Sequence, residues 1–269
     1  MRWLFSFFLL AFASTLLHAA ELDPATAAAF DRYAKLTEQE LQKTPGPHDF
    51  LWIDRHPKEL SLAWLGQPII AAGETLDQGH QIEIPGATFA HWIGTYLVEF
   101  ATFERARDFL LNFADYKYFF KDFFIDSRLV KRDGDRFDAF LRLSRRRFST
   151  VMLNMNVTAN YTGIDANHGY VICRSTHVGE VGHPHQKKKL DQEVPVADEY
   201  GYLWRHNVYW RILQTGDGVF IEVQSLTLSR KAGTLSPSRI LNGFIDDFPR
   251  EFVAGVLDDL RVAFPRPAK

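Results

Sequence analysis

The chain has 269 residues, of which 46% are hydrophobic and 24% charged, an ordinary balance for a globular protein. Its formal net charge of −2 gives no reason to expect nucleic-acid binding, which requires a concentrated positive field. Aromatic residues make up 14% of the chain, with 23 Phe, and therefore indicate a large core or an apolar cavity. The single cysteine, Cys173, excludes an internal disulfide and is expected to pack as a small apolar residue.

Residues 1–20 have the order of a secretory signal peptide. A positive residue at Arg2 precedes an apolar run from Leu4 to Leu17, and small residues follow at Ala19 and Ala20. The apolar run is about fourteen residues long, shorter than the ~20 residues that a membrane-spanning helix needs. We therefore expect an exported protein, periplasmic or secreted, after cleavage near Ala20.

Residues 21–84 are expected to form a partly helical N-terminal extension that packs on a main domain of residues 85–269. Asp23 is a suitable N-cap and Pro24 a suitable first residue for a helix that runs to about Lys43. The residues expected on its apolar face are Phe30, Tyr33, Ala34 and Leu41.

The main domain is predicted to contain long strands that end in one amphipathic helix. The expected elements are a strand over 88–100, a helix capped by Thr102, alternating strands over 137–143 and 151–161, a polar loop over 182–201, and a last helix opened by Pro249. Strands followed by a single helix predict an α+β fold.

The segments Leu203–Leu213 and Val219–Ser229 are predicted to form a hairpin around a two-residue turn at Gly216 and Asp217. This turn length pairs Arg211 with Glu222, whereas a slip of one residue would turn every side chain over. The side chains then expected to face inward are Trp204, His206, Trp210, Ile221, Val223, Ser225 and Thr227.

Short motifs along residues 85–264 resemble those of the START-like, or SRPBCC, superfamily, and in particular a group of uncharacterised exported bacterial members. The segments that carry the resemblance are His91–Gly94, Tyr116, Ser127–Leu129, Leu141–Leu143, Thr150–Asn154, Leu203–Arg211, Asp217–Glu222, Leu228–Arg230 and Pro249–Glu251. The resemblance implies a helix-grip fold, in which a curved antiparallel sheet wraps around a long C-terminal helix and encloses an apolar cavity. The chain departs from that group at Lys231–Leu235 and at His206, where an aliphatic residue is expected.

We therefore expect a hydrophobic small molecule or lipid between the sheet and the last helix, with no catalytic residue, metal or cofactor assigned. The candidate cavity-lining residues are Trp204, His206, Trp210, Val223, Ser225, Thr227, Tyr116, Tyr118, Val256 and Leu260. His206 is expected either to be a satisfied core histidine or to hydrogen-bond a ligand head group. His183 and His185 lack the spacing and partners of a metal site.

Three functions remain open at this stage. The first is an apolar-ligand carrier, the second a polyketide cyclase or dehydratase with His206 as general base, and the third an interaction protein whose cavity is filled by its own side chains. Two basic runs could also contact an anionic membrane surface, although solvated loop tips would have the same composition. Their residues are Arg145, Arg146, Arg147, Lys187, Lys188 and Lys189.

Overall fold

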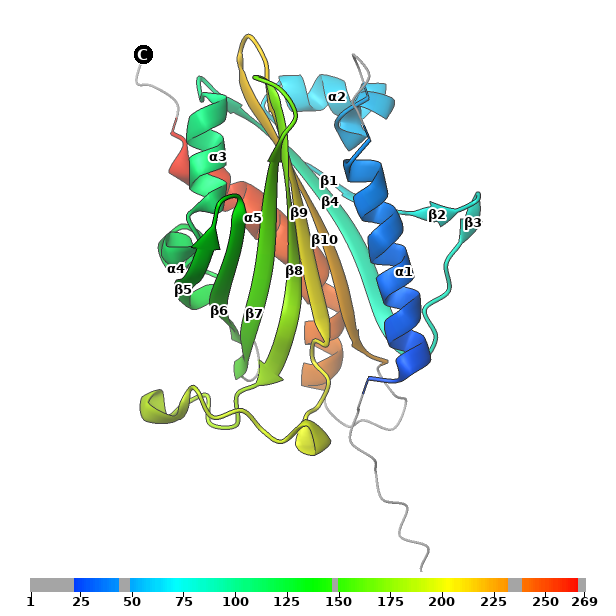
Figure 1. Cartoon of the computed structure of the whole chain (residues 1–269), viewed down its shortest axis with the longest axis vertical. Coiled ribbons are helices and arrows are strands. Elements are labelled where there is room, and N and C mark those ends of the chain that lie inside the picture. The colour runs from blue at the N-terminus through cyan, green and yellow to red at the C-terminus, as the bar shows by residue number, and fades with distance from the viewer. Residues whose placement is uncertain (1–21, 44–48, 147–149, 232–238, 266–269) are drawn as a thin grey trace, which may run out of the picture.

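An eight-stranded antiparallel sheet forms the centre of the protein (Figure 1). The computed structural model describes residues 22–43, 49–146, 150–231 and 239–265. The strand order is β1-β4-β10-β9-β8-β7-β6-β5. The strands are β1 (Ile69–Ala72), β4 (Ala87–Glu99), β5 (Phe124–Asp133), β6 (Arg136–Arg146), β7 (Thr150–Gly163), β8 (His168–Glu180), β9 (Arg205–Gln214) and β10 (Gly218–Arg230).

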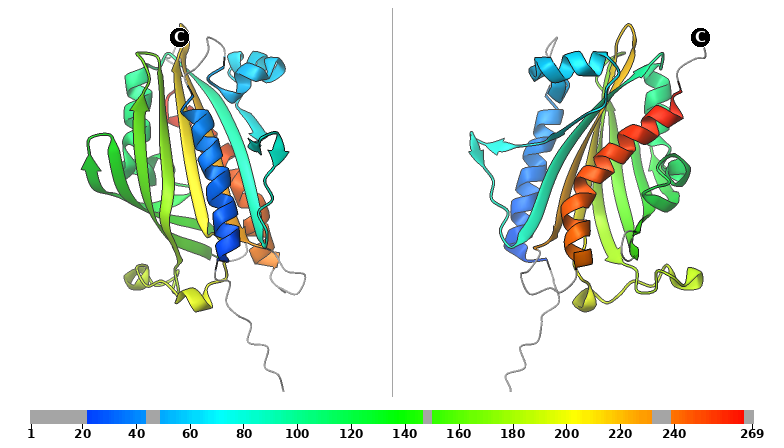
Figure 2. Two further views of the ribbon diagram at one scale, coloured as in Figure 1. Left: turned by 45° about the vertical axis from the view of Figure 1, so that its right-hand side comes forward. Right: turned by 180° about the vertical axis from the view of Figure 1, so that it is seen from behind.

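One long helix, α5 (Arg239–Ala263), crosses the inner face of this sheet (Figure 2). The helices α3 (Phe103–Leu111) and α4 (Tyr116–Phe119) contribute side chains to the same apolar core. An antiparallel sheet wrapped around a C-terminal helix is the helix-grip arrangement. The expected α+β fold class is therefore confirmed.

The last helix begins ten residues before the position that the sequence indicated. Proline favours the first turn of a helix because it has no N–H to donate, so Pro249 was expected to open α5. In the structure Pro249 lies inside the helix. Phe244 and Ile245 are already buried against the sheet, and this upstream apolar contact stabilises helix on both sides of the proline.

The hairpin register is confirmed. Arg211 pairs with Glu222 and Trp210 with Val223 in the β9–β10 ladder. The Thr215 amide donates to the Gly218 carbonyl at 2.8 Å and closes the turn. Trp210 and Val223 both lie in the core beneath α5. The inner face of the hairpin is therefore the one that follows from pairing Arg211 with Glu222 on the other face.

The outer face of the sheet is covered by α1 (Pro24–Leu41). The Asp23 carboxylate accepts from two backbone amides at the start of the helix, as expected of an N-cap. The predicted apolar face is buried, and it packs on a second cluster that includes Tyr209 and Leu226. Glu38 accepts from the Arg174 Nε at 2.6 Å and from the Tyr209 hydroxyl at 3.1 Å, so an ion pair also fastens α1 to the sheet.

The rest of residues 49–84 is irregular and lies along the sheet edge. It contains α2 (Pro57–Trp64), a 3₁₀ turn (Trp52–Arg55), and a two-stranded ribbon of β2 (Leu76–Asp77) and β3 (His80–Gln81). The strand β1 pairs with β4, Ile69 opposite Thr95, and so extends the main sheet from within the segment predicted to be an extension. The boundary at residue 85 stays a prediction.

Candidate functional site

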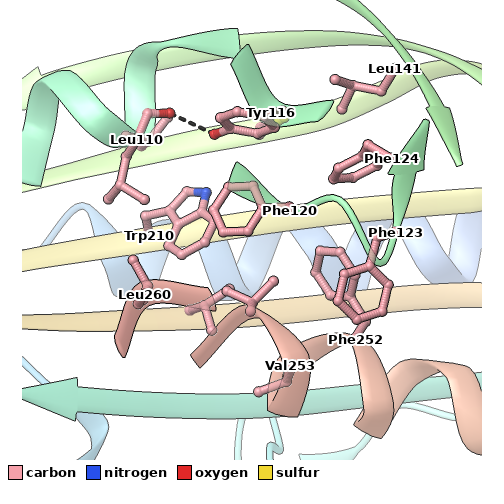
Figure 3. Packing of buried hydrophobic residues seen from close by; sticks show 14 of the residues in the cluster. Leu110, Tyr116, Phe120, Phe123, Phe124, Leu141, Trp210, Phe252, Val253 and Leu260 are labelled. Atoms are coloured by element: carbon pink, nitrogen blue, oxygen red, sulfur yellow. Dashed lines mark hydrogen bonds between the residues drawn. The ribbon is translucent and has the colours of Figure 1, made fainter. Parts of the chain in front are cut away.

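The candidate site is the apolar space between α5 and the inner face of the sheet (Figure 3). The cavity that remains there has a volume of about 30 Å³. A single water needs roughly 10–15 Å³ measured in this way, so the cavity holds at most a few waters. Its wall is formed by Phe113, Tyr116, Phe120, Phe124, Leu141, Met155, Val157, Cys173, His206, Val208, Trp210, Phe252 and Val256.

Aromatic rings occupy most of the space between the sheet and the helix. The Phe120 ring lies 4.9 Å from the Tyr116 ring and 6.3 Å from Trp210, measured between centroids. Figure 3 shows Phe120 beside the Trp210 indole, with Phe252 approaching from α5. These side chains come from three separate parts of the chain, and together they nearly close the cavity.

His206 is the principal polar group of the cavity wall. Its Nε2 lies 3.1 Å from the Ser225 Oγ on the neighbouring strand, and its ring meets Phe252 edge to face at 4.7 Å. Burial lowers the pKa of His206 to about 3, so the imidazole is neutral near pH 7. Among the described residues no carboxylate is paired with the ring, so nothing orients it as a base.

Two further ionisable groups in the wall are held in their neutral forms. Burial raises the pKa of the Cys173 thiol to about 12, which removes the thiolate that a nucleophile would need. Burial raises the pKa of Tyr116, whose hydroxyl donates to the Leu110 carbonyl at 2.6 Å. The described wall is thus an apolar surface with one neutral polar pair, and none of these three ionisable groups is activated as an acid, base or nucleophile.

Most of the candidate residues gather at this site. Tyr116, His206, Trp210 and Val256 line the cavity itself. Val223, Ser225, Thr227 and Leu260 are buried in the surrounding core without lining the cavity.

Two candidates lie elsewhere. Tyr118 is 68% exposed, because α4 is a single turn that buries Tyr116 and presents Tyr118 to solvent. Trp204 packs against the outer cluster under α1. It precedes the first residue of β9, Arg205, so the strand alternation that was used to place it does not apply there.

Sequence reasoning did not select several residues of the wall. Leu141, Met155 and Val157 lie on the apolar faces of the two strands predicted over 137–143 and 151–161, so the period-two pattern identifies them as buried. Phe113 and Phe120 come from the short turns between α3 and β5, and Phe124 is the first residue of β5, so no periodicity distinguishes these buried rings from exposed ones.

Metal binding, membrane spanning and the two basic runs can each be compared with the structure. No group of three His, Cys, Asp or Glu side chains that could hold a metal ion occurs in the described parts of the chain. None of the helices described is both long and apolar enough to span a bilayer. Arg145 is ion-paired with Glu251, Lys187 and Lys188 are exposed, and Arg147 falls outside the described residues.

Comparison with known proteins gives a similarity of architecture. No family model matches the sequence, and no curated protein matches it. The sheet order and the gripped helix decide the fold. It is the helix-grip arrangement, which the resemblance of the sequence to START-like proteins implied.

Solved structures that are similar to this one include proteins from bacteria and human. A STAR-related lipid transfer protein fragment from Xanthomonas axonopodis has 16% identity and a TM-score of 0.46, over 74% of this chain and 94% of that chain. The human StarD13 lipid transfer and protein localization domain has 11% identity and a TM-score of 0.45, over 81% and 98%. The Zhui aromatase/cyclase from Streptomyces has 11% identity and a TM-score of 0.40, over 65% and 88%. At sequence identities this low, the similarity describes the fold and says nothing of the function of this chain.

Proposed function

We propose that this protein binds a hydrophobic small molecule or lipid between the sheet and α5. The observation that carries the proposal is an enclosed apolar wall with one neutral polar pair, His206 and Ser225. Ligand sites of this kind are mostly apolar, with a few polar groups that orient the ligand. Apolar contact would supply most of the affinity, and the His206–Ser225 pair would orient a polar end.

Binding would require the cavity to open. Sites for small molecules usually have volumes of about 300–1,000 Å³, whereas this cavity has about 30 Å³. Phe252 lies on α5, whereas Phe120 lies in the turn that follows α4, so a shift of α5 away from the sheet would make room without unfolding the helix. Ligand-induced opening of this sort is favoured only by as much as the ligand prefers the open form.

Native mass spectrometry of the mature protein, purified without detergent, tests the proposal directly. A stoichiometric added mass that extracts into organic solvent would support it and identify the cargo. If the protein is empty and gains no mass from a lipid extract, the carrier function is wrong.

The small volume favours a second candidate, an interaction protein whose cavity is filled by its own aromatic side chains. In that case the rings would serve stability alone, and partners would bind the surface. The same mass spectra separate the two candidates, because a filled core takes up no ligand.

We also propose that the protein acts outside the cytoplasm, since residues 1–20 have signal-peptide chemistry. Contact with an anionic membrane would use Arg146 and the exposed lysines of the long loop, since each basic residue near such a surface contributes about 1 kcal/mol. Replacing Lys187, Lys188 and Lys189 by Gln should weaken sedimentation with anionic vesicles. Unchanged sedimentation would contradict the membrane contact.

A further inference from the structure

A second and larger hollow lies on the inner side of the same sheet. This groove has a volume of about 590 Å³ and lies between α3, the β5–β6 hairpin and the end of β7. Phe137 of β6 and Tyr161 of β7 line it. Four residues further along the same strands and on the same face, Leu141 of β6 and Val157 of β7 line the closed cavity. The groove and the cavity therefore occupy neighbouring parts of one face.

One aromatic ring of the groove wall packs against one aromatic ring of the cavity wall. Phe137 lines the groove, Phe113 lines the cavity, and their ring centroids are 5.8 Å apart. Among the described side chains, this ring contact therefore connects the wall of the open groove with the wall of the enclosed cavity. A change in the side-chain angles of this pair would join them.

The open side of the groove is lined by two arginines and two aspartates, and one of the arginines, Arg132, has no carboxylate partner in the described chain. The Arg132 guanidinium lies 4.9 Å from the centre of the Phe137 ring, and its Nε donates to the Gly134 carbonyl at 3.1 Å. Within the described chain its two terminal nitrogens have no ion-pair or hydrogen-bond partner.

Arg107 contributes a second guanidinium from α3. It pairs with its neighbour Asp108 at 2.8 Å, but the Asp108 side chain is 69% exposed. Exposed pairs of this kind contribute little, so a ligand anion could take the place of Asp108. Asp108 and Asp135 also line the groove and balance the two arginines, so an anion would be held by direct contact with Arg132.

We propose that this groove is the mouth of the cavity and holds the anionic head group of an amphipathic ligand. The head group lies between Arg132 and Arg107, and the apolar part passes between Phe113 and Phe137 into the cavity. A carboxylate, phosphate or sulfonate has the required chemistry, because a guanidinium binds each of them through paired N–H donors. This assignment rests on the proposed function, since the apolar part needs the cavity.

Two fluorescent probes that differ in one group test the head-group site. Phenylnaphthylamine is neutral, and anilinonaphthalenesulfonate has the same rings with one sulfonate. Titrated into the mature protein, the sulfonate probe should bind more tightly than the neutral probe. Arg132→Gln should weaken binding of the sulfonate about tenfold, the usual loss for a charge-assisted hydrogen bond, and leave the neutral probe unchanged.

Arg128→Gln is the matched control. Arg128 lies on the same strand, but its guanidinium covers Phe140 on the opposite face, so neither probe should respond. If Arg132→Gln affects both probes alike or neither, the head-group site is wrong while apolar binding stands. If neither probe binds the wild-type protein, the proposed function fails and the head-group site fails with it.

The position of the mouth is tested by kinetics. Phe137→Leu should raise the association rate of both probes several-fold, because it removes one ring of the contact between Phe113 and Phe137. Phe140→Leu, on the same strand but facing outward, should leave the rates unchanged. Equal rates for the wild type and Phe137→Leu would overturn the assignment of the groove as the mouth.

Discussion

Two buried histidines are held in their neutral forms by this fold. His206 lies under α5, and His91 lies under α1, where its Nδ1 is 2.9 Å from the Tyr33 hydroxyl. Burial lowers the pKa of His206 to about 3 and that of His91 to about 4, the latter against a smaller opposing effect of Gln224. Both imidazoles are therefore neutral in the folded protein at pH values where an unfolded histidine is charged.

This difference predicts acid sensitivity. Because each folded pKa lies below the unfolded value near 6.5, the unfolded state binds more protons, and stability is full above pH 6.5 and is lost as the pH falls toward 4 and 3. Each histidine should contribute a slope of up to about 1.4 kcal/mol per pH unit to the free energy of unfolding. Denaturant titrations between pH 7 and 4.5 would measure it.

The variants His206→Gln and His91→Gln remove one titrating group each and keep a hydrogen-bonding side chain. Each should flatten the pH dependence relative to the wild type. Parallel curves for wild type and variant would mean that the histidine in question is not buried in a neutral form.

Asp259 on α5 shows the opposite behaviour. Its Oδ2 is buried without a hydrogen-bond partner among the described residues. Burial, and then the charge of Asp122, raise the pKa of Asp259 to about 6. A raised pKa in the folded state means that stability is greatest below pH 4 and declines as the pH rises through 6.

Asp259→Asn should therefore stabilise the protein at pH 7. The carboxyl is only half-buried, so solvent screening reduces the expected gain to about 1 kcal/mol. Thermal melts at pH 7 and pH 4 would test this, since the gain should be present at the first pH and absent at the second. A gain of equal size at both would assign it to something other than the charge.

At the scale of elements, the close approach of α5 to β4 depends on a glycine. A Cβ added at Gly94 would lie 2.5 Å from the Val253 Cγ1 and 3.1 Å from the Leu257 Cδ1. Both partners are fully buried on α5. The glycine of the His91–Gly94 motif thus has a packing role that the sequence did not reveal.

Gly94→Ala should lower the free energy of unfolding by about 1–3 kcal/mol, the usual cost of overpacking a well-filled core. Gly216→Ala, in the β9–β10 turn, is a suitable control, because nothing lies within 4 Å of its added Cβ. Chemical denaturation of the two variants measures the difference. Equal stability of both would show that α5 can move off β4 without cost.

At the scale of the whole molecule, stability and ligand space compete for the same rings. Phe120 is buried in the cavity wall, and Phe220 is equally buried on the outer face beneath Trp64. Removal of either ring should cost about 3–5 kcal/mol of unfolding free energy. Only the loss at Phe120 adds space to the cavity between the sheet and α5.

Phe120→Ala should therefore bind neutral phenylnaphthylamine more tightly than the wild type does, whereas Phe220→Ala should lose stability without that gain. Fluorescence titration alongside denaturation would test both outcomes. Equal binding by the two variants would show that the probe does not enter the cavity.

The sequence alone determined the strand pattern, the N-caps of α1 and α3, and the register of the β9–β10 hairpin. These features depend on neighbours in the chain: Asp23 caps the amides that follow it, and a two-residue turn pairs Arg211 with Glu222 whatever surrounds the hairpin. They agree with the START-like resemblance, which depends on the same local motifs.

Only the tertiary structure decided the start of α5, the position of Trp204, and how little space remains in the cavity. The part of α5 before Pro249 is stabilised because Phe244 and Ile245 are buried against strands that are distant in the sequence. The preference of proline for the first turn of a helix takes no account of such distant contacts. The cavity volume depends on Phe113 and Phe120, which lie in the short turns after α3, and on Phe124 at the very start of β5, where no periodicity marks the buried rings. Local patterns specify which face of an element is apolar, whereas packing between elements decides whether that face encloses a ligand or another ring.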